Sequence, residues 1–344
     1  MSYIIVKMYE ALLYTKNQDK SVDCFLCCHH CHIKNGTYGI CAVRLNKEGT
    51  LYSLSYGKVV AANIDPIEKK PLYHFLPGSK SYSIACVGCN FQCGFCQNWQ
   101  ISQAKVAKEL SLFEYRLNPQ KIVEAAISDN CPSISYTYTE PTIYFEFAFE
   151  TAKLAKEKGL KNVFVTNGYL SKESLEMIKP YLDAANVDLK SFREDFYRKI
   201  CKASLKPVLD NIALMKKVNI WIELTTLLIP GKNDSKEEIK DIAEFIANLD
   251  KDTPWHISAF HPDFEFSELP PTSLKSLESA FDIAKKKGIK YVYLGNVYDN
   301  DKENTLCPSC GKILIRRRGY FIESGVIKEN KCPHCQEKIA GIGL

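Results

Sequence analysis

The stretch CNFQCGFC at residues 89–96 decides the fold, because its three cysteines have the spacing C-x3-C-x2-C directly after a short apolar run. Thiols this close can converge on one metal centre, and thiolates are the usual ligands of iron–sulfur clusters. Cys89, Cys93 and Cys96 would supply three ligands to a [4Fe–4S] cubane and leave one iron open. A zinc knuckle and a group of buried thiols without metal are the alternatives. Cys86 we assign to the preceding strand or loop.

Composition favours a globular enzyme. The chain has 344 residues, 46% hydrophobic and 25% charged, which suits one large domain with one or two small ones. The net charge of +5 is spread over many lysines, and Arg316–Arg318 is the one dense basic run, so nucleic-acid binding is the minority interpretation. No apolar run reaches about 18 residues and the start lacks a signal-peptide pattern. We therefore expect a cytoplasmic protein that does not enter a membrane.

Fifteen cysteines are far more than is usual, and most of them fall into three groups with metal-type spacings. A reducing compartment keeps such thiols available for metals, whereas disulfides would leave one of an odd number unpaired. The first group has the spacing C-x2-C-x3-C-x9-C, enough for a closed tetrahedral site. Zinc or another structural metal is our first interpretation and an auxiliary iron–sulfur cluster the second. Cys28, His29 and His30 leave the ligand choice open. The expected ligands are Cys24, Cys27, Cys31 and Cys41.

The last group consists of two C-P-x-C knuckles separated by 21 residues of strand-like sequence. This pattern is typical of a zinc ribbon. A structural cap and a docking module for a partner both fit it, and the arginines at 316–318 could contact an acidic protein or a nucleic-acid phosphate. The expected zinc ligands are Cys307, Cys310, Cys332 and Cys335.

Between these groups, apolar strands alternate with amphipathic helices, which predicts parallel βαβ units. We expect an α/β fold, a partial (βα)6 TIM-like barrel at residues 77–300, between a Cys-rich extension at 1–76 and a zinc-ribbon-like domain at 301–344. The predicted strands are 81–87, 133–138, 162–166, 185–189, 220–228, 256–260 and 291–294. The predicted helices are 119–128, 144–158, 172–181, 205–217, 236–249 and 273–287.

Chemistry in such folds lies at the carboxyl ends of the strands, and polar residues follow most of the predicted strands. Glu140-Pro141 comes after the second strand and Asp188-Leu189-Lys190 after the fourth. His256 lies inside a strand, and we expect it to be a hydrogen-bonded core residue. The remaining polar candidates are Tyr138, Thr139, Thr166, Asn167, Thr225, Thr226, His261 and Asn296.

These motifs resemble the radical S-adenosylmethionine (SAM) enzymes, in particular the activating enzymes of glycyl-radical proteins such as the pyruvate formate-lyase activase. The arrangement at Cys24–Cys31 and Gly39–Arg44, with Tyr138–Pro141 and Trp255–Pro262, is similar to the radical enzyme of the AmmeMemoRadiSam system. This resemblance covers about residues 20–300. Cys28 stands where a proline is usual, and the ribbon is an addition.

The resemblance implies that the open iron holds the amino and carboxylate groups of SAM. Tyr138-Thr139 replaces the Gly-Gly of a Gly-Gly-Glu-Pro motif, and Val165 replaces an aspartate that helps to hold a monovalent cation in the family. The residues that it implies for cofactor binding are Phe95, Tyr138, Thr139, Glu140, Thr166, Asn167, Asp188, Lys190, Thr226, His261 and Asn296.

The resemblance also implies reductive cleavage of SAM to a 5′-deoxyadenosyl radical that abstracts hydrogen, with loops near 98–110 and 262–271 as lids. A protein or peptide substrate is our first hypothesis, and RNA or a nucleotide is the second. A non-catalytic metal-binding adaptor is the alternative of another class. The implied partners are an electron donor of the ferredoxin or flavodoxin type, an AMMECR1-like protein and a Memo-like protein.

Overall fold

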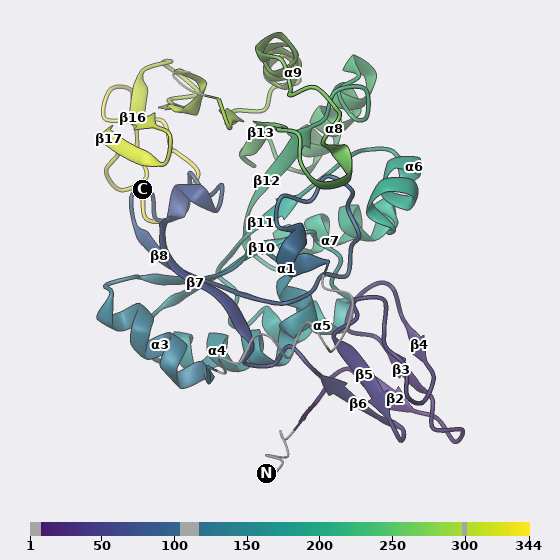
Figure 1. Ribbon diagram of the computed structural model, residues 1–344. Coiled ribbons are helices and arrows are strands. Elements are labelled where there is room, and N and C mark those ends of the chain that lie inside the picture. Colours follow the sequence, from purple (N-terminus) through teal and green to yellow (C-terminus); the bar gives the residue numbers. More distant parts are fainter. Residues whose placement is uncertain (1–7, 104–116, 298–300) are drawn as a thin grey trace.

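The computed structural model describes residues 8–103, 117–297 and 301–344, and an eight-stranded sheet forms its centre (Figure 1). The strand order is β14-β13-β12-β11-β10-β9-β8-β7, and every pair from β8 to β14 is parallel. Each strand thus pairs with the next one in the chain, as repeated βαβ units require. In the described residues β14 does not pair with β7, so this barrel is open on one side. The parallel strands are β8 (Lys80–Cys86), β9 (Ser133–Tyr136), β10 (Lys161–Thr166), β11 (Ala184–Asp188), β12 (Trp221–Leu228), β13 (Trp255–Ala259) and β14 (Val292–Gly295).

Amphipathic helices lie around the outside of the sheet (Figure 1). Four of them begin at a side chain that accepts a hydrogen bond from a backbone N–H of the first turn, at Asn118, Ser171, Ser235 and Ser273. The predicted α/β fold with parallel strands is confirmed, and three predicted helices have the expected bounds. The helices are α3 (Pro119–Ser128), α4 (Phe145–Glu157), α5 (Lys172–Ile178), α7 (Leu205–Lys217), α8 (Lys236–Leu249) and α9 (Leu274–Lys286), with shorter helical segments at α1 (Trp99–Ser102), η2 (Pro141–Tyr144), α6 (Glu194–Phe196) and η3 (Tyr197–Cys201).

The edge strand β7 (Val59–Pro66) was not predicted. It pairs antiparallel with β8, although we had assigned its residues to the N-terminal extension. Its first three residues are half-buried and the next three are exposed, so it lacks the alternation that marks a strand with one buried face. The extension therefore contributes one strand to the barrel sheet.

Residues 8–56, the N-terminal module, form two small three-stranded sheets beside the barrel (Figure 1). Within it, residues 44–53 form an antiparallel strand pair, β5 and β6. Arg44 crosses to α4, where its Nη2 lies 2.7 and 2.8 Å from the carboxylate oxygens of Glu146, and both side chains are fully buried. A buried, hydrogen-bonded ion pair thus joins the module to the barrel. Its strands are β1 (Tyr9–Glu10), β2 (Tyr14–Lys16), β3 (Val22–Cys24), β4 (His32–Ile33), β5 (Arg44–Lys47) and β6 (Thr50–Ser53).

The C-terminal ribbon, residues 301–344, packs against the amino ends of the barrel strands. It contains η5 (Asp301–Glu303) and the strands β15 (Thr305–Leu306), β16 (Ile313–Arg318) and β17 (Phe321–Gly325). A buried polar network closes this end of the barrel. Glu223 of β12 accepts hydrogen bonds from the backbone N–H of Tyr73 and His74 and lies 2.7 Å from Nε2 of His256. His256 is thus a hydrogen-bonded core residue, as predicted.

Candidate active site

The cysteine loop begins where β8 ends, at the carboxyl edge of the sheet. Glu265 donates its backbone N–H to the Gly94 carbonyl at 3.0 Å, and a Cβ on Gly94 would lie 2.8 Å from the Glu265 carboxylate. Trp99 stacks on Phe264 with ring centroids 5.0 Å apart. The expected lid at residues 262–271 therefore lies against the cysteine loop, while most of the other expected lid, 98–110, falls outside the described residues. Close contact explains why glycine stands between Cys93 and the aromatic residue.

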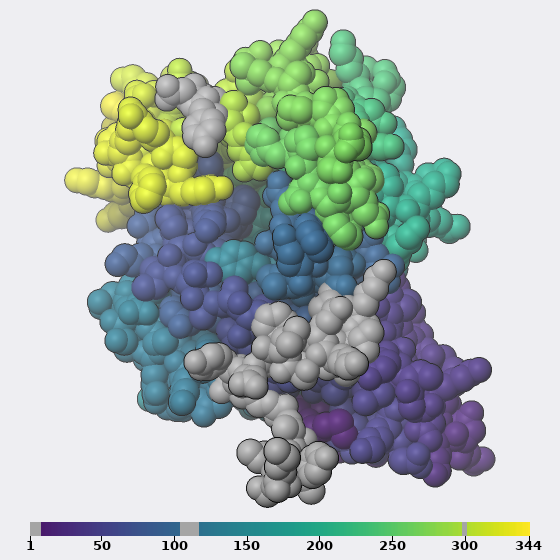
Figure 2. Space-filling model, in the orientation of Figure 1, coloured from purple at the N-terminus to yellow at the C-terminus, as the bar shows by residue number. Residues whose placement is uncertain are grey.

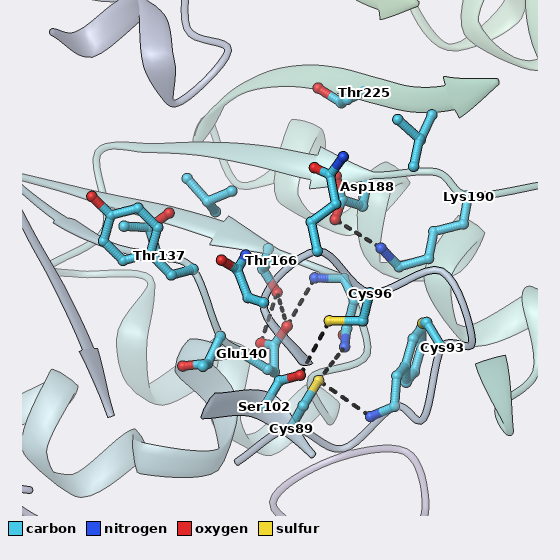
Figure 3. Close-up of a pocket in the computed structure, with 18 of the residues that line it drawn as sticks. Cys89, Cys93, Cys96, Ser102, Thr137, Glu140, Thr166, Asp188, Lys190 and Thr225 are labelled. Atoms are coloured by element: carbon cyan, nitrogen blue, oxygen red, sulfur yellow. Dashed lines mark hydrogen bonds and ion pairs between the residues drawn. The ribbon is translucent and has the colours of Figure 1, made fainter. Parts of the chain in front are cut away.

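A cavity of about 520 Å³ joins this loop to the strand ends. Figure 3 shows the thiols of Cys89 and Cys96 and the Glu140 carboxylate pointing into a common space, with Asp188 and Lys190 beside it. The volume lies in the range of small-molecule sites, about 300–1,000 Å³. Of the predicted residues, the cavity is lined by Cys89, Cys93, Phe95, Cys96, Tyr138, Thr139, Glu140, Thr166, Asn167, Asp188, Lys190 and Asn296.

Glu140 ties two strand ends together. Its buried carboxylate accepts hydrogen bonds from Thr142, from the Thr166 hydroxyl at 2.9 Å and from the Asn167 backbone N–H at 2.8 Å. Burial raises the pKa of Glu140, while these donors act to lower it. Since the protein supplies so many donors, Glu140 fixes the loops after β9 and β10 relative to each other.

The side chains of Tyr138 and Thr139, where the resemblance implies two glycines, both make hydrogen bonds in the structure. Tyr138 has φ of +63°, a left-handed conformation that is uncommon for an aromatic residue. Its hydroxyl donates to the Asp65 carboxylate of β7, and the Lys70 ammonium lies 4.6 Å from its ring centroid. Thr139 donates its hydroxyl to the Cys86 carbonyl at 2.6 Å. Both side chains are thus used to fasten the strand end.

Asp188 and Lys190 form an ion pair with 2.8 Å between Oδ2 and Nζ. Burial alone would lower the pKa of Lys190, but the neighbouring Asp188 carboxylate acts against this and the pKa lies well above its ordinary value. The Lys190 ammonium also lies 5.7 Å from the ring centroid of Phe95. A permanent cation therefore stands next to the cysteine loop, where it can bind a carboxylate.

The comparisons with known proteins agree with this geometry. A model described as the Radical SAM superfamily matches residues 83–246. A Methanocaldococcus jannaschii protein that carries the name glycyl-radical enzyme activating enzyme is 30% identical, over 64% of this chain and 89% of that protein. The chain belongs to the radical SAM superfamily. An uncharacterized protein of the same organism is 46% identical over 96% of this chain and 99% of its own length. The pyruvate formate-lyase-activating enzyme of Clostridium pasteurianum is 25% identical over 47% of this chain and 67% of that enzyme.

This radical SAM enzyme has donor groups that fit the cluster and the cofactor which its family implies. The side-chain nitrogen of Asn90, between the first two cysteines, is buried without a hydrogen-bond partner among the described residues, so it can donate to a cluster sulfur. The side-chain nitrogen of Asn167 lies 3.9 Å from the Cys89 sulfur and donates to the side-chain Oδ1 of Asn90 at 2.7 Å. Burial raises the pKa of Cys89, so this thiol stays protonated until a metal cation binds it.

Two predicted cofactor residues do not line the cavity. Thr226 faces away from it and donates its hydroxyl to the Leu189 carbonyl at 2.9 Å. Thr225, one position earlier on β12, lines the cavity instead, because successive strand residues face opposite sides. His261 is exposed, two residues beyond the end of β13.

Several cavity residues were missed. Lys69 and Tyr320 lie outside the barrel residues 77–300. We had searched for site residues at the ends of the barrel strands, so neither was predicted. Ser258 of β13 also lines the cavity and was not among the predicted residues. Cys201, on the π-helical turn η3, does not line the cavity, but hydrogen bonding with it, together with burial, raises the pKa of Cys93.

Among the N-terminal thiols the structure narrows the choice of ligands. Cys28 donates its thiol to the Leu170 carbonyl at 2.9 Å, and His29 Nε2 lies 2.8 Å from the Asn90 carbonyl oxygen. Both side chains are thus engaged with the barrel. The Cys31 and Cys41 sulfurs would lie 3.8 and 3.9 Å from a Cβ on Gly39. Burial raises the pKa values of Cys24, Cys27 and Cys41.

The ribbon thiols lie closer together. In the described residues, Cys307, Cys310, Cys332 and Cys335 are the group whose ligand atoms all lie within 4.8 Å of one another, and they could hold a metal ion. In the Arg316–Arg318 run beside them, the first and the last arginine are exposed. Arg317 is buried, and Arg318 pairs with Glu323 at 2.8 Å.

A second cavity of about 420 Å³ continues the first along β7. The two share Lys69, Asn98 and Tyr138, and the second is also lined by Asn63 and Ile64. In the described residues β7 pairs on one side alone, with β8. No helix in the described ranges is long and apolar enough to span a membrane.

Proposed function

We propose that Cys89, Cys93 and Cys96 hold a [4Fe–4S] cluster, and that the enzyme uses it to cleave SAM reductively and to abstract hydrogen from a protein or peptide. The observation that carries this proposal is the single cavity that joins the three thiols to Glu140 and to the Asp188–Lys190 pair. In a cubane each thiolate binds a different iron, so the ligands stand farther apart than around a single ion. These three thiols accordingly do not belong to the single-ion group of the described residues.

When bound, the cluster and SAM together supply a 5′-deoxyadenosyl radical, and the protein supplies its placement. Lys190 can bind the SAM carboxylate, with Asp188 orienting its ammonium. Phe95 offers its ring to the adenine, and it is itself packed against Phe266 of the lid, with 6.0 Å between the ring centroids. Thr166 and Asn167, fixed by Glu140, border the same space. The other residues proposed to contact SAM are Tyr138, Thr139 and Asn296.

A polypeptide substrate is favoured by the groove along β7. An extended peptide can add hydrogen bonds to an open strand edge while its side chains enter neighbouring pockets. Because the groove shares lining residues with the main cavity, a peptide bound there would lead into the site of the radical. The rival substrate, RNA, drew its support from the arginines of the ribbon. Arg317 is buried and Arg318 pairs with Glu323, so the run offers phosphates fewer free cations than its sequence suggests.

We propose zinc for the ribbon. Four thiolates at about 2.3 Å from a tetrahedral zinc are about 3.8 Å apart. The Cys307–Cys335 and Cys310–Cys332 sulfurs are 3.5 and 3.7 Å apart. For Cys24, Cys27, Cys31 and Cys41 we propose an auxiliary iron–sulfur cluster rather than zinc, since the compact single-ion group of the described residues is that of the ribbon. Such thiols fit a reducing, cytoplasmic compartment.

Membership in the AmmeMemoRadiSam system is part of the proposal and defines its test. The iron-reconstituted enzyme is reduced under anaerobic conditions and given SAM, with an AMMECR1-like protein, a Memo-like protein or total RNA of the same organism. A ferredoxin or flavodoxin serves as the electron donor. We expect one of the proteins to accelerate 5′-deoxyadenosine formation and to gain a modification detectable by mass spectrometry. Acceleration by RNA alone would replace the polypeptide hypothesis.

A further inference from the structure

The tip of the ribbon reaches the reaction cavity. Tyr320, in the turn between β16 and β17, lines the same cavity as the cluster cysteines, together with Lys69 and Pro71. Tyr320 is 43% exposed, and the next residue, Phe321, is 71% exposed and does not line the cavity. Figure 2 shows the ribbon (yellow) lying directly against the barrel surface rather than apart from it. The ribbon is thus part of the cavity wall.

Buried contacts hold the hairpin of β16 and β17 in place. The Arg317 guanidinium stacks 4.2 Å from the Tyr73 ring centroid and donates to the Tyr73 carbonyl at 2.9 Å and to the Thr305 hydroxyl at 2.7 Å. The Glu303 carboxylate accepts the backbone N–H of Gly319 at 3.1 Å, directly before Tyr320. Gly319 has φ of +60°, which permits the tight turn. The position of Tyr320 is therefore set by the barrel and not by the hairpin alone.

The metal-binding end of the ribbon is joined to the same segment of the barrel. Ile342 donates its N–H to the His74 carbonyl and accepts that of Leu76, both at 2.8 Å. His74 Nδ1 lies 2.6 Å from the Ala340 carbonyl oxygen, and its Nε2 lies 2.5 Å from the Tyr293 hydroxyl. Loss of the metal would release the chain on both sides of the hairpin, because the cysteines flank it in sequence.

We propose that Tyr320 is a positioning residue that closes the wall of the reaction cavity, and that the ribbon metal site serves to hold it there. This inference rests on the proposed radical chemistry. A primary carbon radical takes hydrogen from almost any nearby C–H bond, so the cavity must exclude small solutes until the substrate is in place. The Tyr320 ring excludes them on the side of Lys69 and Pro71. The ribbon, which the sequence left as a cap or a docking module, is thereby a component of the active site.

The test uses perdeuterated 2-propanol as a small probe. The cluster-loaded enzyme is given dithionite as the electron source, SAM and the alcohol, and the fraction of 5′-deoxyadenosine that carries one deuterium is measured. Capture forms one C–D bond at C5′ and breaks one C–D bond of the alcohol, which is left as a carbon radical. We expect a several-fold higher deuterated fraction in Tyr320→Ala, and in Cys335→Ser, which lacks the ribbon metal.

Two matched variants decide the interpretation. Tyr320→Phe keeps the ring, and Phe321→Ala removes the neighbouring ring that does not line the cavity, so both should give the wild-type deuterated fraction. A wild-type fraction in Tyr320→Ala, or an equal rise in Phe321→Ala, would overturn the proposal. Total 5′-deoxyadenosine reports the proposed function separately. If no 5′-deoxyadenosine forms in any variant, photo-crosslinking from p-benzoylphenylalanine at position 320 still tests where residue 320 lies. We expect crosslinks to the peptide that contains Lys69. Crosslinks confined to residues 301–344 would refute the inference.

Discussion

The N-terminal module and the ribbon each carry four cysteines, but the two sets differ in how sequence determines their geometry. The ribbon thiols come from two short knuckles that each fold locally, and they all lie within 4.8 Å of one another. The N-terminal thiols are spread over the longer C-x2-C-x3-C-x9-C pattern, and the module that holds them is fastened to the barrel through His29 and Arg44. The ribbon set is therefore shaped for one ion by its own turns, whereas the N-terminal set depends on docking beside the cysteine loop.

The largest effect should come from removing one ligand of each set. Cys332→Ser should abolish zinc binding at the ribbon and loosen it, since structural zinc contributes on the order of 10–16 kcal/mol in zinc fingers. Cys41→Ser, the matched variant, should lower the iron content and leave zinc unchanged. Metal analysis of both purified proteins measures this. Loss of the same metal in both variants would contradict the proposal that the two cysteine sets bind different metals.

The buried ion pair tests how firmly the N-terminal module depends on the barrel. Arg44→Ala leaves the Glu146 carboxylate buried without its cation, so the free energy of unfolding should fall by about 3–5 kcal/mol. Lys206→Ala breaks an exposed pair, in which the two side chains are 81% and 61% exposed, and should cost less than about 1 kcal/mol. Urea denaturation of the two variants measures both values. Equal losses would mean that the buried pair does not anchor the module.

The ribbon should loosen in acid. Burial lowers the pKa of His74 from 6.5 to about 4; Arg317 and His256 act in the same direction, while Glu223 and the bond to Ala340 oppose it. Between pH 6.5 and 4 the unfolded chain binds a proton that the folded chain does not. The free energy of unfolding should therefore fall as pH falls through this window, by up to about 3 kcal/mol.

His74→Gln removes this titration, so its unfolding free energy should depend less on pH over the same window. His334→Gln changes an exposed histidine of the ribbon and serves as the control. Denaturation at several pH values across the window measures the slopes. An unchanged slope in His74→Gln would show that the ribbon contact is not the acid-sensitive element.

The smallest effect concerns the link between the N-terminal module and the cysteine loop. His29→Ala removes the contact with the Asn90 carbonyl and should cost about 1 kcal/mol of stability. Because Asn90 lies between the cluster cysteines, the electron paramagnetic resonance spectrum of the reduced cluster should also shift. His334→Gln should change neither quantity. A spectrum identical to wild type in His29→Ala would mean that the module does not influence the cluster loop.

The sequence was sufficient wherever periodicity or spacing is local. It predicted the parallel strands, the helices, the three thiols on the loop after β8 and the compact ribbon thiols. It also brought Glu140, Asp188 and Lys190 to one edge of the sheet, because parallel strands end together. These features follow from residues whose partners are near them in the chain or in the next repeat.

Features that depend on distant partners were missed or misplaced. Buried and exposed residues do not alternate clearly along β7, so its pairing with β8 could not be predicted from the sequence. Both Thr225 and Thr226 were candidates and Thr226 was assigned to the cofactor, but Thr225 faces the cavity, because the sequence did not fix which face of the strand each residue lies on. Arg317 looked like part of a solvated basic run, but its partners Tyr73 and Glu303 come from other parts of the chain. Tyr320 enters the cavity for the same reason.

The central claim is that Cys89, Cys93 and Cys96 support reductive cleavage of SAM. The most direct measurement quantifies 5′-deoxyadenosine after dithionite reduction of the iron-reconstituted enzyme with SAM, beside Cys93→Ala and the control Cys131→Ala, whose thiol lies outside the site. We predict product from the wild type and from Cys131→Ala and none from Cys93→Ala. Product from Cys93→Ala, or a loaded wild-type cluster whose electron paramagnetic resonance spectrum does not respond to SAM, would contradict the account.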